Sequence, residues 1–407
     1  ELNVQAVLLG RVVQRGEDLT LNLELVDATT ENVLWAEKFD RKMKDLVSLQ
    51  SEIARDVSNK LRLRLSATER EKVAKTYTAN SEAQRLYLRG RFHWNKRTSD
   101  DFEKAIVYFK QAIERDPTYP LAYAGLADVY VLTPQYARKS TKVFIPLAKS
   151  AAQKAIELDY SLAEPHATLG YVLSLYGADF EGAEREYTKA IELNPKYATA
   201  YQWYSEFLAA AGRKEEAIKT AKTALELEPL SLIIHAGVGL IYWQTREPDK
   251  AIAHLNTTKE LDPNFIPTYQ ILALAYEKKR MFHQSNANSI KAAELAGRDT
   301  SNFSELKSHY ERDGWNGVWK QRVKLLTEQS KKTGRNVDFL LAMNYAKLKN
   351  KEKTLEYLQR VYDERDWRMM NIGIAPGLEF LKGEPRYEEL LRKIGFREEI
   401  RKYGIPE

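Results

Sequence analysis

The sequence contains no cysteine among its 407 residues, and it has no apolar run that approaches the length of a membrane span. The lack of cysteine excludes disulfide bonds, zinc–thiolate centres and cysteine nucleophiles. The lack of a long apolar run predicts that no segment of this sequence crosses a membrane. With 43% hydrophobic and 29% charged residues, the composition is typical of a protein that works through its surface.

Motifs of catalysis and metal binding are also missing. The histidines lie in separate segments, without the spacing of paired metal ligands, at positions His93, His166, His235, His254, His283 and His309. The sequence has no phosphate-binding P-loop, no nucleophile elbow and no kinase catalytic-loop signature. Gly237 and Gly239 stand in the middle of a predicted helix, where glycine allows close helix packing rather than phosphate contact. We therefore predict that this chain is not an enzyme and binds no metal or cofactor.

The charge balance gives little sign of a nucleic-acid partner. The formal net charge is +6 and the pI is near 9.0, but the excess of basic residues is spread thinly toward the end of the chain. Its densest cluster is a predicted turn with lysines at Lys347, Lys349, Lys351 and Lys353. A lysine-rich turn is usually solvated, so we favour a hydrated turn over a phosphate-binding site and expect no nucleic-acid partner.

A repeat dominates what the sequence does contain. Pro195, Pro229 and Pro263 each follow a leucine and a polar residue, and successive prolines are 34 residues apart. Small residues recur where two helices must approach closely, at Ala105, Ala148, Ala183, Ala217 and Ala251, and again at Ala112, Ala155, Ala190 and Ala224. This period resembles the tetratricopeptide repeat. The resemblance implies pairs of antiparallel helices that stack into a right-handed solenoid, because one pair cannot cover its own apolar face.

The repeat pattern also predicts how the chain is divided. Apolar core positions continue into a sixth unit, and Leu341, Ala342 and Tyr345 suggest a weaker seventh. The expected order is six repeats in 81–299, a helical spacer in 300–334, a seventh, degenerate repeat in 335–366 and a capping tail in 367–407.

Several stretches depart from the period. The second repeat carries extra residues around 133–145 and the first has a long turn at 96–101, and such insertions are expected in loops. In the spacer, Trp315 and Trp319 are four residues apart and therefore lie on one face of a helix. We interpret this pair as packing residues of the spacer, with an aromatic ligand cage as the alternative.

The first part of the chain has a different character. Four leucines alternate with polar residues from Leu19 to Leu25, which predicts a strand with one buried face. We expect a small α+β module in 1–66 and a linker in 67–80; the module consists of antiparallel strands at 4–15, 19–28 and 33–41 and an amphipathic helix at about 45–65. The outer strand has an exposed edge, where a second copy of the chain could pair to give a homodimer.

Several segments of this module resemble one bacterial domain. The segments are Val7–Val13, Leu23–Ala28, Leu34–Arg41 and Leu49–Ala54, followed by a repeat that opens with Leu86–Arg91. Together they are similar to the second half of a TolB-like (FlgO-like) amino-terminal domain of bacterial signalling proteins. In that family the module typically follows a serine/threonine kinase, an adenylate cyclase or a winged-helix regulator, often with a membrane helix between.

The resemblance carries expectations about the whole protein. Because the first residue is Glu1 and not methionine, we expect a preceding segment that completes the module. A bacterial protein of this kind lies in the cytoplasm or the periplasm, with a tether to the inner membrane if a membrane helix precedes the module. The side of the membrane is left open.

The expected fold is therefore mainly α: a tetratricopeptide solenoid preceded by a three-stranded antiparallel sheet. In the repeat register of the family, the first helix of each pair lines a concave groove. The side chains placed there are Asp128, Thr168, Tyr171, Gln202, Glu206, Trp243, Gln244, Gln270, Glu277 and Lys278. This mixed lining favours a peptide or protein with apolar and amide-bonding groups.

We predict a non-catalytic interaction or scaffold region of a bacterial signalling protein. One alternative is the regulatory arm of a multidomain enzyme, such as a serine/threonine kinase or adenylate cyclase. The other is a winged-helix DNA-binding regulator whose effector domain lies outside this chain.

Overall fold

A computed structural model of the chain describes residues 6–42, 75–137, 139–174 and 179–395, and single positions at 45, 49, 52, 53 and 56. The chain divides into two compact units. The first unit comprises residues 1–137 and 150–160, and the second comprises residues 138–149 and 161–407.

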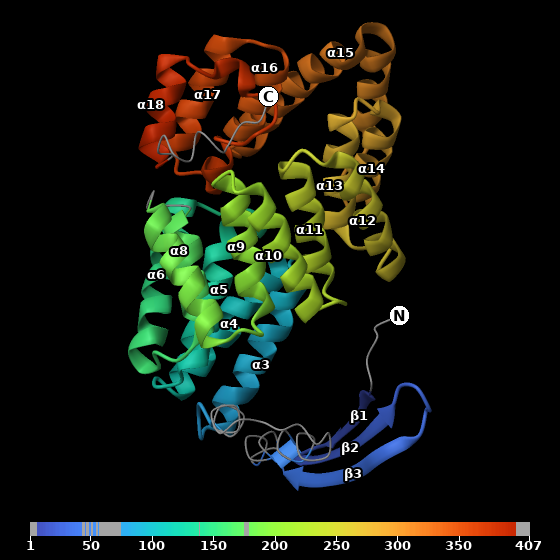
Figure 1. The fold of residues 1–407 in the computed structure, drawn as a ribbon, viewed down its shortest axis with the longest axis vertical. Helices are drawn as coiled ribbons and strands as arrows, with labels where there is room; N and C mark the ends of the chain where they lie inside the picture. Colours follow the sequence, from blue (N-terminus) through green and yellow to red (C-terminus); the bar gives the residue numbers. More distant parts are fainter. Residues whose placement is uncertain are drawn as a thin grey trace. The chain divides into compact units, whose positions relative to one another are not determined.

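The predicted antiparallel sheet is confirmed. Strands β1 (Ala6–Arg15), β2 (Asp18–Asp27) and β3 (Val33–Lys42) pair in the order β1-β2-β3 (Figure 1). The alternating leucines of β2 are buried on one face together with Trp35 and Phe39, which is 2% exposed. At the β1–β2 turn Gly16 has a φ of +61°, a conformation that glycine adopts without a steric penalty.

The helix predicted at about 45–65 and most of the linker predicted in 67–80 lie outside the described residues. Leu49 and Ile53 are two of the positions that are described there. Both are helical and pack against the buried leucines of the sheet. This contact is the one expected of an amphipathic helix covering the apolar face of a sheet.

The rest of the described chain is helical. The first unit contains α3 (Ser81–Lys96), α4 (Ser99–Arg115) and α5 (Pro120–Tyr136), and α6 (Thr141–Leu158) has residues in both units. The second unit continues with α7 (Ala163–Val172), α8 (Phe180–Leu193), α9 (Ala198–Ala210), α10 (Lys214–Leu227), α11 (Leu232–Gln244), α12 (Pro248–Leu261), α13 (Ile266–Lys278) and α14 (Phe282–Leu295). It ends with α15 (Ser301–Thr333), α16 (Asp338–Lys347), α17 (Lys351–Asp363), the 3-10 helices η3 (Trp367–Asn371) and η4 (Glu379–Leu381), and α18 (Pro385–Ile394).

Consecutive helices pack as pairs, and the pairs stack. In the second unit α7 packs on α8, α9 on α10, α11 on α12 and α13 on α14. The first helices of these pairs also contact one another in order, α7 with α9, α9 with α11 and α11 with α13. This is the layered arrangement of a tetratricopeptide solenoid.

The small residues explain how closely the paired helices approach. All the alanines singled out by the repeat pattern are fully buried. Gly239 has the same function in α11, since a Cβ atom there would lie 2.5 Å from Leu255 Cδ2 on α12. Any larger side chain at such positions would push the two helices of a pair apart.

The prolines of the repeat mark a recurring turn. The carbonyl oxygen of Pro263 accepts a hydrogen bond of 2.7 Å from Tyr269 Oη, six residues later. Pro195 accepts in the same way from Tyr201 at 3.2 Å, and the Pro229 oxygen lies 2.9 Å from His235 Nε2. A side chain in the next helix thus satisfies a turn carbonyl that no helix hydrogen bond reaches.

The insertion expected as a loop around 133–145 is largely helical. Helix α5 has 17 residues and α6 has 18, whereas α9 has 13. Val131 and Leu132 are 2% and 4% exposed, so continuing the helix buries them. The turn expected at 96–101 is also short, because Thr98 accepts a hydrogen bond from the Asp101 backbone amide and caps α4 at once.

The spacer predicted in 300–334 corresponds to α15, which is broken at Gly314. This residue has φ 59° and ψ −150°, outside the helical region. The two halves approach closely, since a Cβ atom on Gly317 would lie 2.4 Å from the backbone oxygen of His309. Trp315 and Trp319 stack with centroids 5.8 Å apart, and Trp319 is buried.

The last described helices share one core. Helices α16 and α17 form a further helical pair within 335–366, and the assignment of this pair as a seventh repeat stays a prediction. Tyr387, Leu390 and Leu391 of α18 are buried against that pair, in a cluster that includes Leu378 and Leu381. The described part of the tail thus packs on α16 and α17, its role as the cap of a last repeat stays a prediction, and 396–407 lie outside the described residues.

Candidate functional site

The predicted groove residue of the first unit is deeply buried. Asp128 of α5 has no exposed surface, and its carboxylate accepts a hydrogen bond of 3.1 Å from Arg91 Nη1 of α3. The Arg91 guanidinium also lies over the Trp94 ring, at 4.2 Å. The Asp128 side chain therefore ties neighbouring helices together.

Three predicted groove residues of α7 and α9 are buried as well. Thr168, Tyr171 and Gln202 are 0%, 4% and 8% exposed, and Tyr171 packs against Trp203 with ring centroids 5.1 Å apart. Gln202 Nε2 donates to Glu206 Oε1 at 3.3 Å, and Glu206 is half-buried. These side chains fill the contact between successive first helices.

Of the residues predicted on α11 and α13, four reach the surface, Trp243, Gln244, Gln270 and Lys278, whereas the Glu277 side chain is only 10% exposed. Gln270, Leu274 and Lys278 are exposed and recur every four residues along one face of α13. Trp243 and Gln244 are half-buried at the end of α11, which packs against α13. We call these five residues the α11–α13 surface.

Two polar atoms of this surface have hydrogen-bonding capacity left over. Trp243 Nε1 and Gln244 Oε1 are buried and have no hydrogen-bond partner among the residues that the structure describes. The first is a donor and the second an acceptor. Most buried polar groups in proteins are paired, so these two atoms are exceptions to the usual pattern.

One end of the surface contacts a distant part of the same chain. Arg246, in the turn after α11, donates to Glu379 Oε1 of η4 at 2.9 Å. Gln244 Nε2 donates to Asn371 Oδ1 of η3 at 3.2 Å. We call these four residues the latch. Lys278 belongs to the same electrostatic neighbourhood: partial loss of water and the Arg246 charge lower its pKa, while Glu379 opposes that shift.

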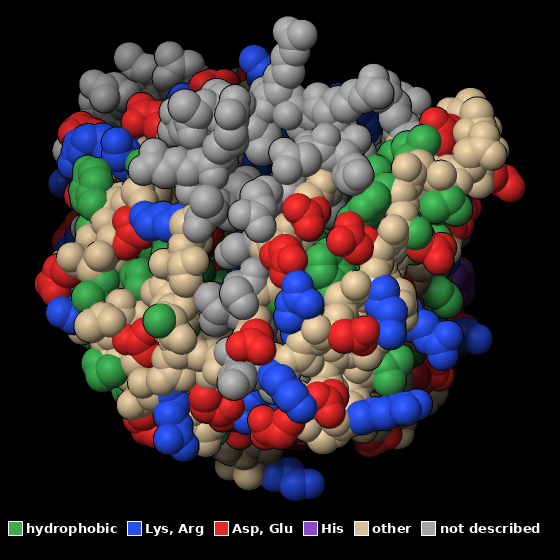
Figure 2. All heavy atoms as spheres, turned by 90° about the horizontal axis from the view of Figure 1, so that it is seen from below, with side chains coloured by type: hydrophobic (Ala, Val, Ile, Leu, Met, Phe, Trp, Pro, Cys, Tyr) green, Lys and Arg blue, Asp and Glu red, His purple; other side chains and the backbone are tan. Residues whose placement is uncertain are grey.

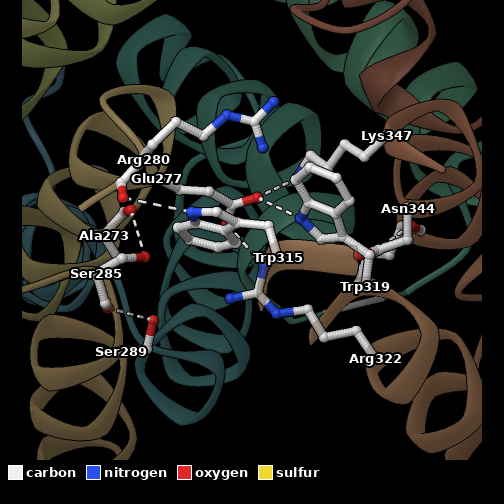
Figure 3. Close-up of polar contacts among 11 residues, drawn as sticks. Ala273, Glu277, Arg280, Ser285, Ser289, Trp315, Trp319, Arg322, Asn344 and Lys347 are labelled. Atoms are coloured by element: carbon white, nitrogen blue, oxygen red, sulfur yellow. Dashed lines mark hydrogen bonds and ion pairs between the residues drawn. The ribbon is translucent and has the colours of Figure 1, made fainter. Parts of the chain in front are cut away.

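Glu277 joins three helices at a different point (Figure 3). Its carboxylate accepts from Arg322 Nη1 of α15 at 2.7 Å, from Lys347 Nζ of α16 at 2.5 Å and from Trp319 Nε1 at 3.4 Å. Burial by itself would raise the pKa of Glu277, but Lys347 and Arg322 outweigh burial and hold that pKa well below its ordinary value. We call these four residues the joint. A carboxylate held in this way by two cations is not available as a general base.

A pair of stacked imidazoles joins α11 and α12. The rings of His235 and His254 have centroids 5.1 Å apart and planes 17° from parallel. Burial and the neighbouring His235 lower the pKa of His254 to about 4. The His254 ring is therefore neutral at pH 7.

Sequence reasoning missed the partners of the surface. Arg246 and Glu379 are 133 residues apart, and nothing in the local pattern of either residue points to the other. The same holds for Arg322 and Lys347, which reach Glu277 from the spacer and from the pair that follows it.

Two wider properties bear on what the chain can contact. On the face shown in Figure 2, basic and acidic side chains are interspersed. Within the described ranges no helix is both long enough and apolar enough to cross a bilayer. The part of the described chain visible on this face therefore shows no extended basic patch of the kind that duplex binding uses.

Family models described as tetratricopeptide repeat match three segments, 83–119, 177–236 and 211–264. Among curated proteins, the chain is 31% identical over 179 residues to "Putative adenylate cyclase 3" of Rhizobium meliloti, covering 43% of this chain and 30% of that protein. It is 27% identical over 187 residues to the TPR repeat-containing protein YpiA of Bacillus subtilis, covering 46% and 42%. It is 24% identical over 304 residues to the transcriptional regulator HilA of Salmonella typhimurium, covering 73% and 54%.

The chain thus spans between three tenths and just over half of the length of these relatives. Among solved structures it is similar to a human IFIT1 dimer, with a TM-score of 0.47 and 18% identity over 79% of this chain and 78% of that one. It is also similar to a tetratricopeptide protein of Thermus thermophilus, with a TM-score of 0.41 and 18% identity over 48% and 99%. Residues 83–119 and 177–264 therefore match the tetratricopeptide repeat, a repeat that generally mediates protein–protein interactions.

Proposed function

We propose that the chain is a non-catalytic interaction region of a bacterial signalling protein, and that it binds a peptide or protein partner across the first helices of its repeats. The observation that carries the proposal is the α11–α13 surface. It combines exposed Gln270, Leu274 and Lys278 with half-buried Trp243 and Gln244 on two helices in contact. This mixture of amide, apolar and cationic groups suits an extended peptide.

Rigidity supports binding by this surface. The side chains behind it, such as Tyr269, Leu272 and Ala273, are buried in the packing of α13. The surface is therefore organised before a ligand arrives, and most of the ordering cost of binding falls on the ligand. Trp243 supplies the aromatic anchor that often dominates binding energy in such interfaces.

Site-specific photo-crosslinking in bacterial cells tests the proposal. A photoreactive phenylalanine analogue replaces Gln270 on α13 in one variant and Lys222, which is exposed on the second helix α10, in the matched control. We expect a crosslinked partner from position 270 and none from position 222. Trp243→Ala should reduce the yield from position 270 without a large change in the melting temperature. Equal crosslinking from both positions would show that the partner does not bind specifically at the first helices.

The relatives favour a second candidate, in which the chain is the regulatory arm of a larger effector. It matches 30% of a protein named as an adenylate cyclase and 54% of a transcriptional regulator. We further propose that its sheet is part of a TolB-like module, which stands next to such effectors in signalling proteins. The intact mass of the native polypeptide and the reading frame before Glu1 test this candidate. A native protein without an effector domain would contradict it.

We also propose that β1 pairs with a second copy of the chain. Among the described strands β1 pairs only with β2, so one edge is left open. Leu9 and Val12, which point to opposite faces of the sheet, are 51% and 63% exposed. A strand that is apolar on both faces is suited to a covered position. Sedimentation as a monomer at all concentrations would refute the pairing.

A further inference from the structure

We infer that the latch occupies a carboxylate-binding site, and that the partner of the α11–α13 surface is a peptide with an acidic side chain that replaces Glu379 on Arg246. The inference rests on the proposed function and adds the chemical class of the partner. In the closed latch the chain's own carboxylate blocks that site, so the latch is an autoinhibitory contact.

The Glu379 carboxylate is held as the carboxylate of a bound ligand would be held. Its Oε1 accepts from the Arg246 guanidinium at 2.9 Å, and its Oε2 accepts from the Gly377 backbone amide at 2.7 Å. The neighbouring residues Leu378 and Leu381 are buried in the C-terminal core at 2% and 0% exposure. The segment is therefore anchored elsewhere, and the Glu379 carboxylate reaches Arg246 from that anchored position.

On the repeat side of the latch, the two positive charges of Arg246 and Lys278 lie near the single negative charge of Glu379. The positive charge of Arg246 disfavours the charged form of Lys278 and the Glu379 carboxylate favours it, so Glu379 is the compensating carboxylate at this point. If Glu379 turned away, two cations would face solvent beside Trp243 and Gln244. An acidic peptide would restore the charge balance.

The latch is a weak contact and the joint is a strong one. Arg246 and Glu379 keep 24% and 34% of their side-chain surface exposed, so water screens the pair. The Glu277 carboxylate is only 10% exposed and has two cationic partners. A ligand can therefore displace Glu379 while the joint continues to hold α13, α15 and α16 together.

Self-occupation has a quantitative consequence. The anchored Glu379 acts at a fixed effective concentration, and the apparent affinity for an added peptide falls by the fraction of chains whose site is free. Removing an exposed ion pair of this kind should raise that apparent affinity about two- to fivefold.

Fluorescence polarisation of short peptides on the full chain tests the inference. The probe is a labelled peptide, Gly-Leu-Glu-Phe-Leu, which copies residues 377–381, and the matched probe has glutamine in place of glutamate. The proteins are wild type, Glu379→Gln, the double variant Glu379→Gln with Arg246→Ala, and a control, Glu352→Gln. Glu352 is an exposed carboxylate of α17 that pairs with Arg386, away from the latch.

We expect Glu379→Gln to bind the glutamate probe about two- to fivefold tighter than wild type, and to prefer it over the glutamine probe. The control should bind as wild type does, and the double variant should lose the preference. Equal binding by wild type and Glu379→Gln, a preference that survives Arg246→Ala, or no binding to any variant would each overturn the inference. If a partner were crosslinked at position 270 in equal yield from wild type and Glu379→Gln, the proposed function would stand, but the inference that Glu379 blocks the site would be refuted.

Discussion

Replacing Glu277 with glutamine measures how firmly the joint holds the last helices. Glutamine keeps the size of the side chain but removes the charge that pairs with Arg322 and Lys347 at 2.7 and 2.5 Å. Removing one partner of a fully buried ion pair costs about 3 to 5 kcal/mol, because the other charge is left uncompensated. Arg322 and Lys347 keep 22% and 25% of their side-chain surface, so water relieves part of that penalty. We expect a loss of about 3 kcal/mol.

Hydrogen exchange with mass spectrometry localises the effect. A loss of about 3 kcal/mol corresponds to exchange faster on the order of a hundredfold for amides that are exposed when the joint opens, in α13, α15 and α16. The control is Glu352→Gln, because the Glu352 carboxylate is 74% exposed and its pair should contribute less than about 1 kcal/mol. Similar exchange in the two variants would refute the view that the joint is the stronger contact.

The pH dependence gives a second check on Glu277. Its pKa in the folded chain lies below the ordinary value of 4.5, so its stabilising contribution is fully present above that pH. The contribution is lost as the pH falls through the folded pKa. The stability difference between wild type and Glu277→Gln should therefore be constant near neutral pH and shrink below about pH 4.5. A difference that grows on acidification would contradict the assignment.

Two further predictions concern α11 and α12. The pKa of His254 is lowered to about 4 in the folded chain, so protonation below pH 6.5 favours the unfolded chain. Because the His254 ring is partly exposed, we expect acidification from pH 7.5 to 5 to lower the free energy of unfolding by about 1 kcal/mol. That loss should be absent in His254→Gln, measured by urea unfolding, and an unchanged pH dependence would argue against it. Gly239→Ala should destabilise the chain by about 1 to 3 kcal/mol, because the new Cβ atom would lie 2.5 Å from buried Leu255. Gly237→Ala, whose Cβ atom would have no neighbour nearer than 3.5 Å, is the matched control and should be neutral or stabilising in the same assay.

Local signals account for the parts of the fold that the sequence predicts well. The alternating leucines of β2 and the periodic alanines specify burial through spacing alone, and β2 and β3 begin and end within one residue of the predicted positions. The prediction of a loop near Thr133 was wrong because it rested on the rule that insertions in repeats lie in loops, whereas the buried Val131 and Leu132 favour continuing α5. Packing decided that boundary, and packing is not visible in local propensity.

The candidate site was harder to predict for a physical reason. Repeat register says which face of a helix a residue occupies, but it does not say how deeply the next helix covers that face. It therefore selected Thr168 and Tyr171, which are buried, together with Gln270 and Lys278, which are exposed. The partners at the latch come from more than a hundred residues away, and a single sequence holds no local trace of such a contact.

The hydrogen bonds at the repeat prolines suggest how such a chain can lengthen. Each bond joins a proline carbonyl to a side chain six residues later, as from Tyr269 to Pro263, so both partners lie within one inherited segment. A duplicated segment contains both partners of its own turn hydrogen bond, so that bond requires no matching change in neighbouring repeats. Adding a whole repeat to the regular part of the array therefore disrupts few existing contacts. The joint and the latch have partners that lie far apart in the sequence, so an insertion between those partners would separate them.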